Sequence, residues 1–170
     1  MAVSIRLAPN IEQRLNQLAE QTPVVLPLHP RTVAALKRLP GVTLNPSVLV
    51  IEPVGFLEMT WLLAKCSLVL TDSGGVQEEA PSLGKPVLVI RDTTERPAAV
   101  DAGTVKLVGT DQQKIIDEAT ILLDSQDAYS AMARAINPYG DGKAASHLVS
   151  LHHPPAAAPQ AQAPARPRAL

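Results

Sequence analysis

CSLVLTDSGGVQEEAPSLGKPVLVI, residues 66–90, is the stretch that decides the fold. An apolar run, Cys66–Leu70, leads into the glycine turn Ser73-Gly74-Gly75, and a helix-like segment follows. Gly84 then stands where glycine commonly ends a helix, and a second apolar run follows it. The order of strand, glycine turn, helix and strand predicts a βαβ unit of a parallel sheet.

The same alternation continues on both sides of this unit. The apolar runs predict strands at residues 24–28, 48–51, 66–70, 87–90 and 104–108. Helical periodicity and turn residues predict helices at 11–22, 31–39, 75–83, 111–123, 126–136 and 143–151, and one that ends near Lys65. In that last helix we expect Leu57, Trp61, Leu62 and Ala64 on the apolar side, with Trp61 and Leu62 in the core. The fold class is therefore α/β, a doubly wound parallel sheet of about five strands.

Bulk composition excludes several classes of protein. A length of 170 residues fits one domain, and a net charge of −1 argues against a nucleic-acid partner. The single cysteine, Cys66, excludes an intrachain disulfide and a multi-cysteine zinc site. No charged-then-apolar leader opens the chain, and no apolar run approaches the roughly 18–20 residues that span a bilayer. These features predict a soluble, cytoplasmic chain with no membrane partner.

The chain divides into three segments. Residues 1–10 are poorly defined, because the first six residues offer no turn or cap signal. Residues 11–151 contain the alternating elements and form the predicted domain. Residues 152–170 are rich in alanine and proline, which make up twelve of the seventeen residues from Pro154 onward. This composition predicts a disordered tail.

The glycine turn has the chemistry of a phosphate site. A helix N-terminus offers unpaired N–H groups and a partial positive charge to an anion. Gly74 and Gly75 lack a Cβ, so phosphate oxygens can approach the backbone, and Ser73 can cap the helix or bond a phosphate. Glu79 lies about one and a half turns further along, where a carboxylate could bind a ribose diol. A tight strand-to-helix turn without a ligand explains the same glycines, and spacing alone leaves both interpretations open.

Other polar residues are weaker candidates. Adjacent helical residues point about 100° apart, so Glu78 and Glu79 cannot both face one ligand, and Glu79 is the better candidate. Arg96, which precedes Pro97, is the best anion ligand of a charged loop that also fits a structural ion-pair network. His29 follows a predicted strand, but no acidic residue beside it in the sequence would orient it for catalysis.

Four segments together resemble one known family. TDSGGVQEEAPSLGKPVLVIRDTTERPAAVDAGTVKLVGTD (residues 71–111) and NPYGDG (137–142) are similar to signatures of bacterial non-hydrolysing UDP-N-acetylglucosamine 2-epimerases. Leu28-His29-Pro30 and Ile51-Glu52-Pro53 also fit in order. The resemblance covers roughly residues 11–151 and is to the C-terminal half of the family chain.

The resemblance implies a fold, a reaction and a set of roles. The family has a GT-B-like fold of two Rossmann-like domains, and it interconverts UDP-GlcNAc and UDP-ManNAc by eliminating and re-adding UDP. It implies that Ser73, Gly74 and Gly75 hold the diphosphate, Glu79 the ribose, and that Arg96 lies near the diphosphate. Residues 53–59 would flank the uracil, with Val54 and Met59 where the family often has a glutamine and an aromatic residue. No cofactor or metal is expected.

The chain also departs from the family pattern. Family chains are about twice as long, and their first domain supplies the acidic residues assigned to proton transfer at C2. The chain therefore resembles a truncated epimerase, a UDP-binding lobe whose catalytic residues are expected on the missing domain. A separate N-terminal lobe or a homodimer is an expected partner. In some members of the family, a histidine at the His29 position is linked to a second, regulatory substrate site. The alternatives are the C-terminal half of a UDP-sugar glycosyltransferase and a non-catalytic nucleotide-binding module.

Overall fold

A computed structural model describes residues 2–4, 11–28, 34, 43–140, 143 and 148, with only the backbone described for residues 2–4, 11 and 12. The chain forms two compact units, Met1–Tyr139 and Gly140–Leu170, and every element with described bounds lies in the first. His29, most of the predicted helices at 31–39 and 143–151, and the predicted tail at 152–170 lie outside the described residues.

The first unit is built on one parallel sheet. Its strands lie in the order β3-β2-β1-β4-β5-β6, and each neighbouring pair is parallel. The doubly wound α/β class predicted from the sequence is confirmed. The strands are β1 (Ala2–Ser4), β2 (Val24–Pro27), β3 (Val48–Ile51), β4 (Val69–Thr71), β5 (Val87–Val89) and β6 (Val105–Leu107).

The sixth strand is the one that the sequence did not predict. β1 comes from the N-terminal residues that carry no turn or cap signal, and it lies between β2 and β4. Ala2 is in register with Val25 on one side and with Val69 on the other. β1 therefore joins two halves of the sheet, although it contains only three residues.

Six helices have described bounds. The cap predicted for α6 is present, since the Asp111 carboxylate accepts a hydrogen bond from the Lys114 backbone N–H at 2.8 Å. Gly84 has φ of 65°, the left-handed conformation that glycine adopts after a helix. The sequence did not predict α5, whose five residues are too few to show helical periodicity. The helices are α1 (Ile11–Gln21), α3 (Phe56–Lys65), α4 (Gly74–Ser82), α5 (Pro97–Asp101), α6 (Gln112–Asp124) and α7 (Gln126–Ala133).

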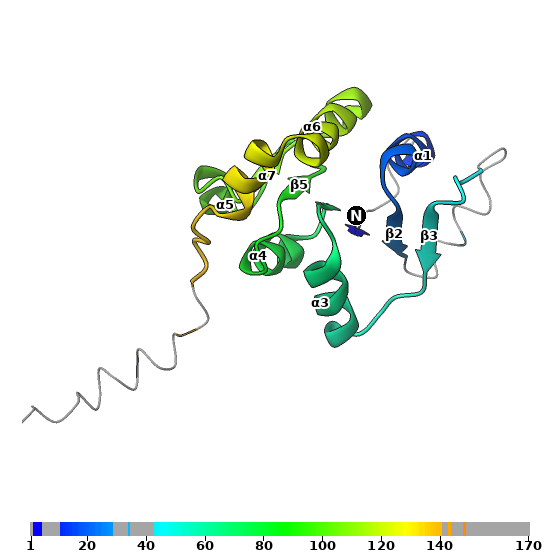
Figure 1. Ribbon diagram of the computed structural model, residues 1–170. Helices are drawn as coiled ribbons and strands as arrows, with labels where there is room; N and C mark the ends of the chain where they lie inside the picture. Colours follow the sequence, from blue (N-terminus) through cyan, green and yellow to red (C-terminus); the bar gives the residue numbers. More distant parts are fainter. Residues whose placement is uncertain are drawn as a thin grey trace, which may run out of the picture. The chain divides into compact units, whose positions relative to one another are not determined.

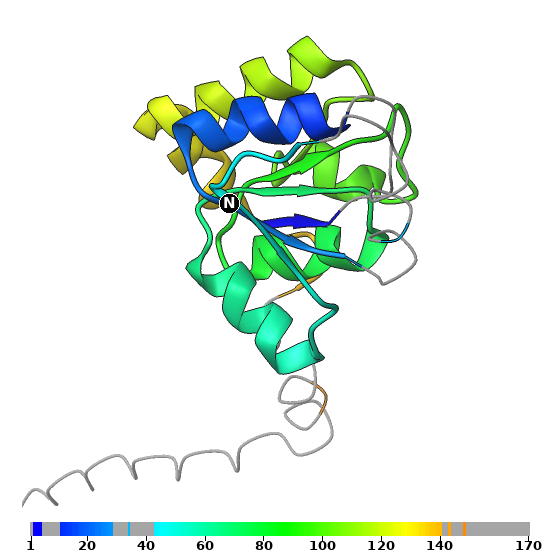
Figure 2. The ribbon, with the colours of Figure 1, turned by 90° about the vertical axis from the view of Figure 1, so that its right-hand side faces the viewer.

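Two apolar cores lie on opposite faces of the sheet. Successive strand residues point to opposite faces, so Leu70 and Leu88 pack with α1 and α6, whereas Val69, Val87 and Val89 pack with α3, α4 and α5. Figures 1 and 2 show α1 beside α6 on one side of the strands, with α3 on the other. Helices on both faces bury the strands, which explains their continuous apolar sequences.

The apolar side of α3 is mostly exposed, which corrects a sequence prediction. Trp61 and Leu57 are 60% and 77% exposed, and Leu62 is half-buried, whereas Leu63 faces the core. Helical spacing correctly predicted an apolar stripe, but Trp61 does not belong to the core. An apolar groove of about 440 Å³ runs along this helix, lined by Ile51, Val54, Leu57, Glu58, Trp61 and Leu62.

Candidate nucleotide-binding site

The glycine turn lies where the strand order reverses. β1 and β4 are neighbours in the sheet, and the chain proceeds outward from them in opposite directions. In doubly wound sheets, ligands bind outside the carboxyl ends of the strands at this switch point. β4 ends at Thr71 and leads directly into Ser73, Gly74 and Gly75. The topology therefore brings the predicted phosphate turn to the expected binding edge.

Ser73 occupies the N-cap position of α4. Its backbone N–H donates to the Thr71 hydroxyl at 3.0 Å, which fixes the turn. Its own side chain makes no capping hydrogen bond to α4. An N-cap serine usually satisfies one of the free N–H groups at the helix start. Here the serine hydroxyl and the first N–H groups of α4 share one helix end without that bond, so both can bind an anion.

Glu79 lies on the same side of α4 as Gly75. A Cβ placed on Gly75 would be 3.8 Å from Glu79 Oε1 and 4.0 Å from Ser73 Oγ. Residues four apart on a helix share a face, and Glu79 and Gly75 are both exposed. The structure thus brings together Ser73, Gly75 and Glu79, in an arrangement that suits a diphosphate at the helix end and a ribose hydroxyl pair beside the carboxylate.

An acidic side chain already lies beside Gly74. A Cβ on Gly74 would come within 2.7 Å of Glu95 Oε1, and Arg91 Nη1 donates to Glu95 Oε2 at 3.0 Å. A carboxylate is stabilised near a helix N-terminus, where the helix dipole is positive. Glu95 therefore places negative charge next to the start of α4.

Arg96 is engaged in an ion pair with Glu78. Its Nε donates to Glu78 Oε1, and both side chains are about two-thirds buried. Burial raises the pKa of the Tyr139 hydroxyl above 10.0, the Glu78 carboxylate adds to the rise, and the Arg96 charge opposes it. Both arginines of the charged loop thus form ion pairs, as the structural interpretation of that loop predicts. Glu78, the weaker of the two adjacent glutamate candidates, is bound to Arg96.

Gln77 was not singled out from the sequence, although its position contains a signal. The buried residues of α4 are Val76, Gln77, Ala80 and Pro81. A glutamine on this otherwise apolar face must find partners for a buried amide. Its Nε2 donates to the Ser73 carbonyl at 3.3 Å, and its Oε1 accepts from the Thr94 hydroxyl at 2.8 Å.

Three residues predicted to contact a ligand or to lie near the uracil remain to be located: Met59, Val54 and His29. Met59 belongs to α3, and it is half-buried against the core shared with α4 and α5. Val54 precedes α3 and lines the apolar groove. His29 lies outside the described residues.

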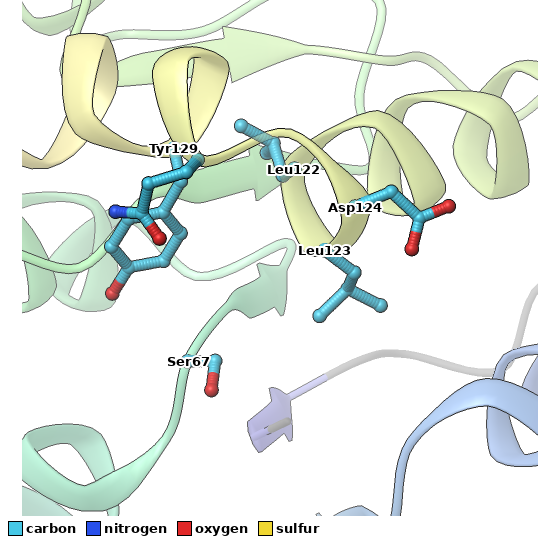
Figure 3. A pocket seen from close by; sticks show the side chains of 6 residues that line it. Ser67, Leu122, Leu123, Asp124 and Tyr129 are labelled. Carbon is cyan, nitrogen blue, oxygen red and sulfur yellow. The ribbon is translucent and has the colours of Figure 1, made fainter.

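A second pocket lies at the other edge of the sheet. It has a volume of about 280 Å³ and is lined by Ser67, Leu122, Leu123, Asp124, Gln126 and Tyr129. Figure 3 shows that its walls come from the junction of α6 and α7 and from the segment that leads into β4. Burial raises the pKa of the Tyr129 hydroxyl, and Cys66 adds to the rise. Because this pocket is at the amino ends of the strands, it is separate from the glycine turn.

Residues 5–152 match the family model described as UDP-N-acetylglucosamine 2-epimerase. The match includes the glycine turn, Glu79, the charged loop and the segment that begins at Asn137. The chain belongs to the UDP-N-acetylglucosamine 2-epimerase family. The Asn137–Tyr139 segment, which is part of the family match, lies near the end of α4. Asn137 Nδ2 donates a hydrogen bond to Ser82 Oγ at 2.7 Å.

Relatives of this family cover most of the chain, but the chain covers only part of each relative. It is 55% identical over 128 residues to UDP-N-acetylglucosamine 2-epimerase of Escherichia coli K12, which is 74% of this chain and 34% of the relative. It is 61% identical over 98 residues to a probable member from Ralstonia solanacearum, covering 58% and 26%. The chain thus spans between a quarter and about a third of the length of these relatives.

Crystal structures of the family show the same fold. The Neisseria meningitidis UDP-GlcNAc 2-epimerase bound to UDP-GlcNAc is 44% identical with a TM-score of 0.76, over 88% of this chain and 43% of that one. The Methanocaldococcus jannaschii enzyme in complex with UDP-GlcNAc and UDP is 32% identical with a TM-score of 0.63, over 89% and 44%. A glycotransferase of kitacinnamycin, at 17% identity and a TM-score of 0.57, shares the fold alone.

Two negative findings apply to the described part of the chain. Among its residues, no three His, Cys, Asp or Glu side chains are grouped closely enough to hold a metal ion. Within the same residues, the helices are too short or too polar to cross a membrane.

Proposed function

We propose that this chain binds the UDP moiety of UDP-N-acetylglucosamine, as the nucleotide-binding half of a UDP-GlcNAc 2-epimerase. The observation that carries the proposal is the glycine turn at the switch point of the sheet. It combines two glycines, a helix N-terminus and a serine hydroxyl that makes no capping hydrogen bond. Family membership narrows the nucleotide to UDP, because two structural relatives are described as complexes with UDP-GlcNAc.

Each site residue has one proposed role. The Ser73 hydroxyl and the N–H groups of Gly74 and Gly75 bind the diphosphate, and the Glu79 carboxylate accepts hydrogen bonds from the ribose hydroxyls. Arg96 adds positive charge beside the diphosphate as UDP leaves, with its guanidinium oriented by Glu78.

The proposal includes two further contacts. Met59 lies near the uracil, and His29 is a candidate for a second ligand contact. The binding step requires no cofactor or metal ion, and neither nucleic acid nor a membrane is a proposed partner.

Epimerisation itself requires groups from a second lobe. Interconversion of UDP-GlcNAc and UDP-ManNAc needs a proton removed from and returned to C2, and the residues proposed here bind only the leaving group. We place the acid and base on a complementary N-terminal lobe, supplied by another chain or by a larger polypeptide in the cytoplasm. Because catalysis depends on groups positioned from both sides of the cleft, the isolated chain should bind UDP and not epimerise.

Calorimetry and thermal unfolding with UDP test the binding step. UDP at about ten times its Kd should stabilise the chain by about 1.4 kcal/mol and raise its Tm by roughly 3–6 °C. Ser73→Ala should weaken binding about tenfold, because a hydrogen bond to a charged oxygen is lost. Ser67→Ala, an exposed serine at the opposite edge of the sheet, is the matched control and should leave the Kd unchanged. No heat and no thermal shift at millimolar UDP would overturn the proposal.

A chromatographic assay of UDP-ManNAc formation tests the second step. The pure chain should give no product from UDP-GlcNAc. Addition of a separately produced N-terminal lobe of a relative should restore activity if the two lobes assemble. Product formed by this chain alone would show that its own residues perform the proton transfer.

A further inference from the structure

Gln77 links the glycine turn to the loop that carries Arg96. Its side chain is fully buried, and it donates to the Ser73 carbonyl at 3.3 Å and accepts from the Thr94 hydroxyl at 2.8 Å. The Thr94 oxygen in turn accepts the backbone N–H of Arg96 at 3.0 Å. A continuous chain of hydrogen bonds therefore runs from the turn after β4 to the residue that caps α5.

The direction of these hydrogen bonds selects an amide at position 77. Thr94 has one hydroxyl proton and donates it to Gln77 Oε1, so its lone pairs are left to accept from the Arg96 N–H. The Gln77 NH₂ group is then directed at the Ser73 carbonyl. A carboxylate could accept from Thr94 but could not donate to Ser73, and an apolar side chain could do neither.

We infer that Gln77 is a positioning residue that fixes Arg96 relative to the glycine turn, so that both contact one diphosphate. The inference rests on the proposed UDP site and adds a residue that does not touch the nucleotide. The backbone of Arg96 is held through Thr94, and its guanidinium is held by Glu78 of the same helix, α4. A single helix thereby orients both ends of Arg96 and also supplies the N–H groups at the turn.

A purely structural role for Gln77 makes a different prediction. In that case substitution would weaken folding and would affect UDP binding equally whether or not Arg96 is present. If Gln77 acts through Arg96, the two substitutions are coupled, and the effect of one on the Kd disappears once the other has been made. A double-mutant cycle on the Kd for UDP therefore separates the two roles.

The cycle uses Gln77→Met and Arg96→Ala, with UDP as the probe in calorimetry. Gln77→Met keeps the length of the side chain and removes both hydrogen bonds, and it should raise the Kd about tenfold. In the Arg96→Ala background it should change the Kd less than twofold. Gln113→Met, at an exposed glutamine of α6, is the control and should have no effect. An unchanged Kd in Gln77→Met, or an equal increase in both backgrounds, would overturn the inference.

Two additions keep the test decisive. If Gln77→Met does not fold, Thr94→Val breaks the same link at a half-buried position, and the same coupling with Arg96→Ala is expected. Hydrogen exchange of the Arg96 amide in the ligand-free chain provides a readout that does not need UDP. Exchange should accelerate about tenfold in either variant, and an unchanged rate contradicts the link. Failure of the wild-type chain to bind UDP would instead count against the proposed function.

Discussion

The backbone at Gly75 separates the requirements of folding from those of binding. A methyl group there would make ordinary contacts with Glu79 and Ser73, at 3.8 and 4.0 Å. Alanine also has a higher helix propensity than glycine. Gly75→Ala should therefore fold with equal or slightly higher Tm. The same methyl would occupy space needed by a phosphate oxygen, so the Kd for UDP should rise at least about tenfold. Calorimetry and thermal unfolding of one preparation measure both effects, and tight binding with the methyl present would contradict the proposed phosphate position.

The carboxylate of Glu95 competes for the position proposed for the diphosphate. It lies beside Gly74 at the start of α4, held by Arg91. Glu95→Gln removes a negative charge that would repel the ligand, and a charge near a helix end is worth about 0.3–1 kcal/mol. The variant should bind UDP roughly two- to fivefold more tightly at low salt, and the gain should shrink as salt screens the repulsion. Asp127→Gln, an exposed charge on α7, is the control, and weaker binding by Glu95→Gln would contradict the competition.

Two neighbouring residues of α3 differ sharply in what they contribute to stability. Leu63 is 1% exposed in the core with α4 and α5, whereas Trp61 is 60% exposed. Leu63→Ala should lower the free energy of unfolding by about 2–5 kcal/mol. Trp61→Gln should change it by no more than about 0.5 kcal/mol. Urea unfolding of the two variants measures the difference, and a large loss in Trp61→Gln would place that side chain in a core that the structure does not show.

Helix α1 contains a buried arginine, Arg14, that lowers the stability of the fold. Arg14 is 5% exposed, and its Nη2 donates to the Thr110 carbonyl at 2.6 Å. In the described part of the chain its Nε and Nη1 have no hydrogen-bond partner. A buried unsatisfied donor costs about 1–3 kcal/mol, so Arg14→Met should stabilise the chain by a similar amount. Urea unfolding tests this against Lys114→Met, an exposed substitution on α6, and a destabilised Arg14→Met would show that the charge has a partner.

Sequence periodicity predicted the elements that bury an apolar stripe and missed those defined by their neighbours. The prediction for α6 was correct to within a residue, because its apolar spacing and its Asp111 cap are both local signals. β1 lies among residues without a turn or cap signal, and α5 contains only five residues, so both are recognised only from the strands they pair with or connect. Exposure of Trp61 also depends on what covers a helix, which spacing cannot reveal.

In the candidate site, too, the sequence predicted the residues of one local motif and missed the contacts between separate elements. Ser73, Gly74, Gly75 and Glu79 are close in sequence, so one motif predicts them together. The bonds from Arg96 to Glu78 and from Thr94 to Gln77 join residues 18 and 17 apart, across a strand and a loop. Contacts between elements depend on how the sheet assembles, so the local sequence pattern does not predict which of these side chains pair.

At the scale of the whole unit, the sheet depends on β1, a strand of only three residues. Among the described strands, β1 alone pairs with both β2 and β4, so it joins β2 and β3 to the half of the sheet that carries the glycine turn. Terminal residues commonly tolerate change, but a strand that pairs within a sheet is an exception. β1 has a neighbour on both sides, since Ala2 is in register with Val25 of β2 and with Val69 of β4.

Val3→Pro tests this dependence. Proline lacks the N–H that would donate to the neighbouring strand, and it is disfavoured in a central strand. Because a partner carbonyl is also left unpaired, the free energy of unfolding should fall by at least about 2 kcal/mol, which lowers the Tm by roughly 4–8 °C for a chain of this length. Ala163→Pro, in the segment predicted to be a tail, should leave the Tm unchanged. Equal Tm values for the two variants would mean that β2 and β3 are held to the rest of the sheet by the helices, and that the nucleotide-binding edge does not depend on the N-terminal residues.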